Sequence, residues 1–220
     1  MPKLGMPEVR RRQLIEATCI TVHRYGLADA TVQRIAHEAG LSTGIVHHYF
    51  AGKADLLAQT MRALLEDLRQ DLVERLRRAV DPEARVRAVL EANFAPSQFQ
   101  PALVATWLAF WAEAPHAPAL LRLRRIYTRR TLTNLRAPLA DLLPPDEASR
   151  AAVTLAAMID GFWLRAAQDQ PDFDGEEAKR LTLRHLDLEL RAARGAPAHR
   201  RPTPAPKTTA TIQDASETAT

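Results

Sequence analysis

The sequence predicts an all-α protein that begins with a three-helix helix-turn-helix unit and continues as a larger helical domain. Apolar residues recur at intervals of three and four along most of the chain, and no convincing run of alternating β-branched residues is found. Proline and glycine divide these periodic segments. With 220 residues, 46% of them hydrophobic and 25% charged, the chain can build the sizeable core of a globular protein.

Three helices are predicted in the N-terminal quarter. In the first, over 7–25, apolar residues keep the helical period, and Gly26 is a natural stop. A second helix extends from an N-cap at Thr31 to Gly40. A third and very short helix follows in the segment LSTGIVHHYF, with Ser42 as its cap.

The rest of the chain is predicted to form six further helices. A long one covers about 53–80 and ends at Asp81-Pro82. Prolines separate the other five, at roughly 83–95, 101–113, 118–136, 146–168 and 175–194. We place a helix-turn-helix domain at 1–52 and a second helical domain at 53–194. Residues 195–220 are rich in Pro, Thr and Ala, which predicts a disordered tail, with a basic accessory arm as the alternative.

Charge and cysteine content limit the classes of function. The net charge is only +4, so a nucleic-acid surface has to be a local patch. The single cysteine, Cys19, excludes an intrachain disulfide and is interpreted as a small apolar residue of the first helix. No stretch approaches the ~20 apolar residues of a membrane span, and no secretory signal is found. We expect a cytoplasmic protein without a membrane partner.

The short third helix carries side chains that suit DNA. About seven residues give a helix roughly 10 Å long, which fits within the major groove. Gly44 removes a side chain where a backbone has to approach DNA, and Ile45 and Phe50 are expected to face inward. Hydroxyls and imidazoles for phosphates and base edges come from Ser42, Thr43, His47, His48 and Tyr49. The alternative is a solvated polar face in a turn-rich part of a helical protein.

Further basic residues and the two adjacent histidines near this helix bear on phosphate and metal binding. Phosphate neutralisation, and hence salt-dependent binding, is expected from Lys3, Arg10, Arg11, Arg12, Arg34 and Lys53. A metal site at His47 and His48 is not expected, because adjacent helical residues point ~100° apart and no acid or thiol lies at i+4. The chain has no nucleophile with a nearby base and no glycine-rich phosphate loop. We therefore expect no catalytic residues and no enzyme.

Residues 30–57, ATVQRIAHEAGLSTGIVHHYFAGKADLL, closely resemble the DNA-binding motif of the tetracycline-repressor (TetR) family. The likeness comprises a Thr cap, Ile-Ala, Ala-Gly, Ser-x-Gly, an aromatic-Phe pair and a Lys followed by Leu. It implies an all-helical homodimer with an N-terminal operator-binding domain and a C-terminal ligand-binding and dimerisation domain. Two positions depart from the family: His47 stands where Tyr is most frequent, and Gly52 where Ser or Asn is often found.

The same resemblance implies roles for individual residues. Thr43, Gly44 and His47 or His48 would face the groove, while Tyr49 and Lys53 hold phosphates. A dimer would place two reading helices about 34 Å apart on a near-palindromic operator. The predicted DNA-binding set is Thr31, Ser42, Thr43, Gly44, His47, His48, Tyr49 and Lys53.

Aromatic residues are scarce, at 5%, and seven of the twelve lie in two regions: Phe94, Phe99, Trp107, Phe110, Trp111, Phe162 and Trp163. Trp107, Phe110 and Trp111 share one helix face. Asp160 lies in the otherwise apolar run LAAMIDGFWL, and Tyr127 on the intervening helix. Rings with one acid suit a quaternary ammonium cation. The alternatives are core or dimer packing for the rings and a buried backbone or basic partner for Asp160.

Several strings of the chain are similar to a subgroup of the family, the choline-responsive repressors of glycine betaine synthesis: MPKLGM, RRRQLIEAT, LSTGIVHHYF, WLAFWAEAPHAPAL, RRIYTRRTLTNL and IDGFWLRAA. This likeness spans roughly 1–190. It implies an osmoprotection repressor with choline as effector and no further cofactor. By chemical inference, the candidate choline site comprises Trp107, Phe110, Trp111, Tyr127, Asp160 and Trp163. A polyamine, an acyl thioester or a drug as inducer is the alternative.

Release of DNA requires two conformations of the dimer. Choline has to bind the one with mis-spaced reading helices more tightly than the operator-bound one. The dimer interface is expected from 146–168 and 175–194, packed as a four-helix bundle. Its expected apolar residues, for which intramolecular packing is the alternative, are Leu155, Ile159, Leu164, Leu181, Leu183, Leu186 and Leu190.

Overall fold

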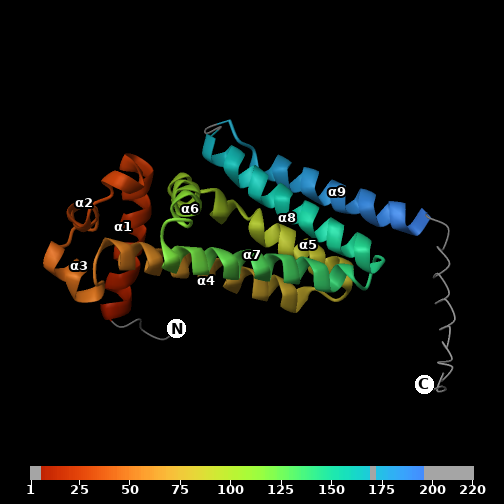
Figure 1. The fold of residues 1–220 in the computed structure, drawn as a ribbon, viewed down its shortest axis with the longest axis horizontal. Coiled ribbons are helices and arrows are strands. Elements are labelled where there is room, and N and C mark those ends of the chain that lie inside the picture. Colours follow the sequence, from red (N-terminus) through yellow and green to blue (C-terminus); the bar gives the residue numbers. More distant parts are fainter. Residues whose placement is uncertain (1–5, 169–171, 196–220) are drawn as a thin grey trace, which may run out of the picture.

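A computed structural model describes residues 6–168 and 172–195, and these form α-helices, one 3-10 helix and no strand (Figure 1). The all-α prediction is confirmed. The elements are α1 Met6–Asp29, α2 Val32–Glu38, α3 Thr43–Tyr49, α4 Lys53–Arg78, α5 Pro82–Asn93, η1 Pro96–Phe99, α6 Pro101–Glu113, α7 Pro118–Leu139, α8 Pro145–Gln168 and α9 Gly175–Gly195. Apart from Gly195, the predicted tail lies outside the described residues.

The helices form an elongated molecule with α1, α2 and α3 at one end (Figure 1). From this end α4 extends into the second domain, where α5, α7, α8 and α9 run lengthwise. Helix α6 lies between the two parts and packs extensively on α1. The reading helix α3 is therefore at an extremity, where it is free to meet DNA.

Local sequence signals account for the helix ends of the N-terminal domain. The hydroxyl of Thr31 accepts a hydrogen bond from the backbone N–H of Arg34, and that of Ser42 from Ile45, so both predicted caps are confirmed. At Gly26 the structure differs in part from the prediction. This residue has φ 74° and kinks α1, but a further helical turn follows the kink as far as Asp29.

The N-terminal domain has its own hydrophobic core, which comprises Leu14, Ala17, Ile35, Ala36, Ala39, Val46, Phe50 and Leu56. Leu56 belongs to α4, so the first turn of that helix completes this core. Phe50 is buried as predicted, whereas Ile45 is only half-buried. The prediction for Ile45 was wrong because Val46, one turn before Phe50, has the phase that points inward.

In α8 and α9, several residues predicted for the dimer face are buried within the single chain. Leu155, Ile159, Leu186 and Leu190 are at most 3% exposed and belong to the core of the single chain. The alternative of intramolecular packing is confirmed for these four. Two of the predicted residues, Leu164 and Leu181, remain open, together with Val153 of α8 and Leu188 of α9, at exposures of 37–59%. We call these four residues the open apolar stripe.

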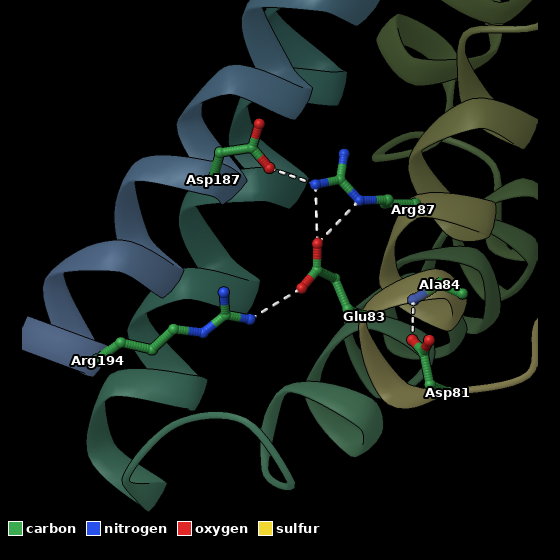
Figure 2. A network of polar contacts seen from close by, with 6 residues as sticks. All are labelled: Asp81, Glu83, Ala84, Arg87, Asp187 and Arg194. Carbon is green, nitrogen blue, oxygen red and sulfur yellow. Dashed lines mark hydrogen bonds and ion pairs between the residues drawn. The ribbon is translucent and has the colours of Figure 1, made fainter.

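A network of ion pairs joins the two ends of the second domain's sequence (Figure 2). Arg87 of α5 contacts Glu83 one turn earlier and Asp187 of α9, and Glu83 also pairs with Arg194 at 3.0 Å. Asp81 accepts from the backbone N–H of Ala84 and so caps α5. The network holds α9 against α5.

The described part of the chain lacks two features that would indicate other functions. None of its helices combines the length and apolarity needed to cross a bilayer. The same residues include no group of three His, Cys, Asp or Glu side chains that could hold a metal ion.

Candidate DNA-reading helix and ligand-binding cluster

The short helix α3 presents one polar face to solvent. Thr43, His47 and His48 are exposed, whereas Val46 is fully buried against the N-terminal core. Thr43 and His47 lie one turn apart and so share a face. Within the described residues, the side chains of Thr43 and His47 form no hydrogen bond or ion pair, so both can contact a ligand in front of the helix.

Gly44 lies on the same exposed part of α3. A Cβ atom at this position would meet only the Oγ of Ser42, at 3.8 Å. Nothing in the chain itself therefore requires a glycine, and glycine inside a helix costs about 1 kcal/mol relative to alanine. A bare backbone facing outward is what a closely approaching DNA surface requires.

Tyr49 is half-buried at the end of α3, between His48 and the first helix. Its ring makes an edge contact with His48 at 4.9 Å, and the guanidinium of Arg11 lies 5.8 Å from both the Tyr49 and Phe50 rings. Arg11 thus stabilises the end of α3 by cation–π contacts. The predicted phosphate contact of Tyr49 stays a prediction.

Lys53 has a structural role that sequence reasoning missed. Its ammonium donates hydrogen bonds to the backbone oxygens of Leu27 and Ala28, at 2.6 and 2.8 Å. The side chain thereby ties the start of α4 to the last turn of α1. Because an ammonium has three donors, one remains for the predicted phosphate contact. Replacing Lys53 by alanine would remove the tie as well, so this variant does not isolate DNA binding.

Several other expected phosphate ligands are engaged within the chain. Arg12 pairs with Asp67 of α4 at 3.0 Å, which raises the pKa of its guanidinium. Arg10 donates to Gln13, and Arg34 donates to the backbone oxygen of Asp29 while lying 4.6 Å from the Tyr25 ring. Lys3 lies outside the described residues. Arg12 and Arg34 therefore join α1 to α4 and α2, and the contact of Arg10 lies within α1.

The second candidate site is a set of rings from three helices, which we call the aromatic cluster: Trp107, Trp111, Tyr127 and Trp163. Trp107 lies at the centre, with ring centroids 5.4 Å from Tyr127, 5.5 Å from Trp163 and 6.2 Å from Trp111. The structure thus brings together four of the six residues proposed for a cation site. They come from α6, α7 and α8.

Phe110 contacts the aromatic cluster only through Trp107, at 5.8 Å. Its side chain also faces a small apolar gap between α6, α1 and α4, next to Val22 and Met61. Phe110 is therefore placed between the ring cluster and the helices of the DNA-binding domain. This is a position for transmitting movement of α6.

Asn93 at the end of α5 is a site residue that sequence reasoning missed. Its side chain is buried, its backbone oxygen accepts from the Trp163 indole at 3.3 Å, and its Oδ1 accepts weakly from the Tyr127 hydroxyl at 3.4 Å. The sequence signal that could have revealed it is a polar residue at a position where the helical period of α5 places apolar residues. The indole N–H of Trp107 is buried and finds no hydrogen-bond acceptor in the described part of the chain. Such a donor costs free energy unless a ligand or water accepts from it.

Asp160 lies at the edge of the cluster, on the exposed side of α8. Desolvation raises the pKa of its carboxyl, and the positive charge of Arg124 opposes the rise. Burial, reinforced by the negative charge of Asp160, raises the pKa of Tyr127. Asp160 is therefore close enough to act on the rings by long-range charge, as a counter-ion for a cation without hydrogen-bond donors requires.

A cavity adjoins the aromatic cluster between α4, α5 and α7. Tyr127 and Asn93 form part of its wall, aliphatic side chains such as Leu68 line it, and Arg69 and Arg130 contribute charge. The cavity and the ring cluster thus share Tyr127. A ligand entering from this side would reach the rings by displacing the Tyr127 side chain.

Comparison with known proteins assigns both halves of this arrangement. Residues 14–60 match the model of the tetR family of bacterial regulatory proteins, and residues 82–191 that of the C-terminal domain of BetI-type transcriptional repressors. The chain belongs to the TetR family. Its TetR-type helix-turn-helix and BetI-type C-terminal domain are those of a DNA-binding transcriptional regulator, and the expectation of no enzyme is confirmed.

The chain aligns with curated relatives over nearly the whole length of those proteins. The HTH-type transcriptional regulator BetI of Paraburkholderia xenovorans (strain LB400) is 48% identical over 191 residues, 86% of this chain and 98% of that protein. BetI of Ectopseudomonas mendocina (strain ymp) is 46% identical over 197 residues, 88% of this chain and 100% of that protein.

Solved structures of other transcriptional regulators share the fold. A transcriptional regulator from Pseudomonas aeruginosa PAO1 has a TM-score of 0.73 at 30% identity, covering 87% of this chain and 95% of that one. A regulator from Saccharomonospora viridis, solved in complex with choline, has a TM-score of 0.71 at 19% identity, covering 80% and 95%. At that identity the second likeness concerns the fold alone.

Proposed function

We propose that this TetR-family protein is a choline-responsive repressor that binds a near-palindromic operator as a homodimer and controls the genes for conversion of choline to glycine betaine. The aromatic cluster carries the proposal, because it gathers ring faces beside a carboxylate in a BetI-type domain. Ring faces and a distant negative charge suit a trimethylammonium group. The naming of the relatives and the choline complex of a structural neighbour support the same ligand.

The closed state of the cluster supports a mechanism of release. Because Trp107 touches Tyr127, Trp163 and Trp111, a trimethylammonium group has to part these rings to enter. Trp107 and Trp111 belong to α6, which packs on α1. Opening the cluster therefore moves α6 against the DNA-binding domain, and choline favours that state because it binds only there. The unpaired Trp107 N–H offers a donor to the choline hydroxyl.

The ligand half of the proposal is tested with Trp111→Ala. Trp111 is half-buried at the edge of the cluster, so we expect its loss to remove a cation–π face without unfolding the domain. Gel shifts with DNA from the protein's own upstream region, with and without choline, should show unchanged operator affinity and no release by choline. Phe173→Leu is the control and should respond normally, because Phe173 contacts Phe99 and is separated by that ring from Trp163 of the cluster. A Trp111 variant that still releases DNA with choline contradicts this site.

The reading face is tested with His47→Ala. His47 is exposed on α3 and forms no intramolecular hydrogen bond within the described residues, so the change should leave folding intact. We expect operator affinity to fall by about 1–3 kcal/mol, while binding to random duplex changes little. Titrations of both duplexes at one salt concentration measure the difference. Equal losses on the two duplexes would show that His47 does not read bases.

The charge of Asp160 predicts a pH dependence of choline binding. Its raised pKa means that the carboxyl is protonated at a higher pH than an ordinary aspartate, so acidification removes the counter-ion of the ligand. Calorimetric affinity for choline should therefore fall as pH drops through the titration of Asp160. Asp160→Asn should weaken choline roughly tenfold at neutral pH and abolish the pH dependence. A pH-independent affinity in the unaltered protein is the contrary outcome.

One feature favours a second candidate, a TetR-type repressor with an anionic inducer such as an acyl thioester. The cavity beside Tyr127 combines leucine side chains with Arg69 and Arg130. Arg69 is, however, already paired with Glu66 at 2.6 Å, which lowers the pKa of that carboxyl to about 2. Calorimetry with choline and with an acyl thioester separates the candidates, since only the true inducer gives heat and releases DNA.

A further inference from the structure

Helix α7 concentrates positive charge as no other described helix does. Its 22 residues include six arginines and no acidic residue. The chain as a whole has a net charge of +4, so the remainder of the chain is net negative, at −2. The excess of positive over negative charge is therefore accounted for by one element.

Four of the six arginines form a line on the outer face of α7, which we call the arginine stripe: Arg122, Arg125, Arg129 and Arg136. Their spacings of three, four and seven residues place them on one side of the helix, and all four are exposed. Fourteen residues at ~1.5 Å each give a stripe about 21 Å long. Thr133, between Arg129 and Arg136, adds a hydroxyl on the same side.

The stripe has no partner within the described residues. Arginines on neighbouring helices, such as Arg69, Arg75 and Arg87, pair with carboxylates of their own chain. The other two arginines of α7 each lie near a carboxylate: Arg124 interacts electrostatically with Asp160, and Arg130 with Glu66. None of the four stripe residues forms an ion pair or a side-chain hydrogen bond in the described part of the chain. Four unpaired like charges along one helix repel each other, and an aligned polyanion would relieve this repulsion.

The chemistry of α7 selects among polyanions. Insertion into a lipid surface requires a broad apolar face beside the basic one. On α7, Leu120, Leu123 and Leu135 are buried in the core, Leu121 and Leu132 are half-buried, and Ile126 is 38% exposed, which does not make a broad apolar face. A second copy docked by a two-fold axis would bring arginine against arginine. A row of guanidinium groups with a hydroxyl matches a phosphodiester backbone, which presents about a dozen phosphates over 21 Å of duplex.

We propose that the arginine stripe of α7 is a second DNA-binding surface, which holds the phosphate backbone of a duplex segment other than the one read by α3. Helix α7, which carries the stripe, runs lengthwise in the second domain, while α3 lies at one end of the molecule (Figure 1). A duplex docked on α3 therefore does not pass along α7. The stripe bridges to another segment, without sequence preference, and a protein already held on DNA by α3 meets such segments at high local concentration.

The first test measures bridging by the full-length protein. DNA from the protein's own upstream region is immobilised, and capture of a labelled random duplex is recorded with and without protein. Combined Arg125→Gln, Arg129→Gln and Arg136→Gln should lower capture at least about tenfold and leave the gel shift of the upstream DNA unchanged. A matched triple variant with the same charge change, Arg62→Gln, Arg78→Gln and Arg85→Gln on exposed positions of α4 and α5, should capture normally.

The second measurement needs no operator. Affinity for a random duplex is followed against salt concentration, and the stripe variant should flatten the slope of log K against log salt by about 2–3, while the control variant should not. The proposal is overturned if the stripe variant changes neither the capture of random duplex nor the salt slope. It is equally overturned if the stripe variant and the control variant change them to the same extent. It is also overturned if anionic phospholipid vesicles, and not duplex, lose binding in the stripe variant.

Discussion

Leu188→Arg is expected to yield a folded monomer that binds operator DNA about 10²–10⁴-fold more weakly than the unaltered protein. Leu188 is 53% exposed and lies in the open apolar stripe with Val153, Leu164 and Leu181. Exposed apolar side chains on two helices that pack on each other are typical of a helix-bundle contact with a second copy. A charge there cannot be buried unpaired, and a monomer presents one reading helix in place of two.

Sedimentation velocity and a gel shift on upstream DNA measure the two effects separately. Val153→Arg, on the other helix of the stripe, should behave alike. Val80→Arg is the matched control, because Val80 is 92% exposed in the turn between α4 and α5, outside the stripe. It should leave both assembly and DNA affinity unchanged. A Leu188 variant that still forms dimers would place the interface elsewhere on the molecule.

Trp163→Ala is expected to lower the free energy of unfolding by about 3–5 kcal/mol. The side chain is 4% exposed, its ring lies 5.3 Å from Phe99 and 5.5 Å from Trp107, and its indole N–H donates to the backbone oxygen of Asn93. Removing it leaves a cavity and an unpaired buried carbonyl. At a fixed protein concentration, the melting temperature should fall by roughly 6–20 °C.

Trp111→Ala serves as the comparison, because it removes the same side chain from a half-buried position in the same cluster. Its loss of stability in a denaturant titration should be less than half as large. Equal losses would mean that Trp163 is not the packing centre between η1, α6 and α8. The difference also explains why Trp111 is the better residue for testing choline: absence of response in a Trp163 variant could reflect unfolding alone.

Local signals predicted the N-terminal domain well. Thr31 and Ser42 cap their helices because a short side chain with an oxygen can reach the free N–H groups of the first turn, whatever lies further away. Gly26 adopts a left-handed φ for an equally local reason. The spacing of Trp107 and Trp111 on one face of α6 also required only the helical period.

Long-range contacts were not predictable in the same way. Arg12 and Lys53 have the charge of phosphate ligands, yet they contact Asp67 and the end of α1, which lie 55 and about 26 positions away in the chain. Period and composition do not reveal such partners. Asn93 was overlooked for the same reason, since its role depends on Tyr127 and Trp163 from two later helices.

The sequence by itself determined which segments are helical, most of the positions where they begin and end, and which family of regulators they form, because these depend on side chains within one or two turns of each other and on residue types at fixed spacing. Only the tertiary structure decided which leucines of α8 and α9 are core and which remain open, and that the rings of the cluster lie closed upon one another. An apolar residue has the same helical period whether its neighbour comes from its own chain or from a second copy. The fold alone supplies that neighbour.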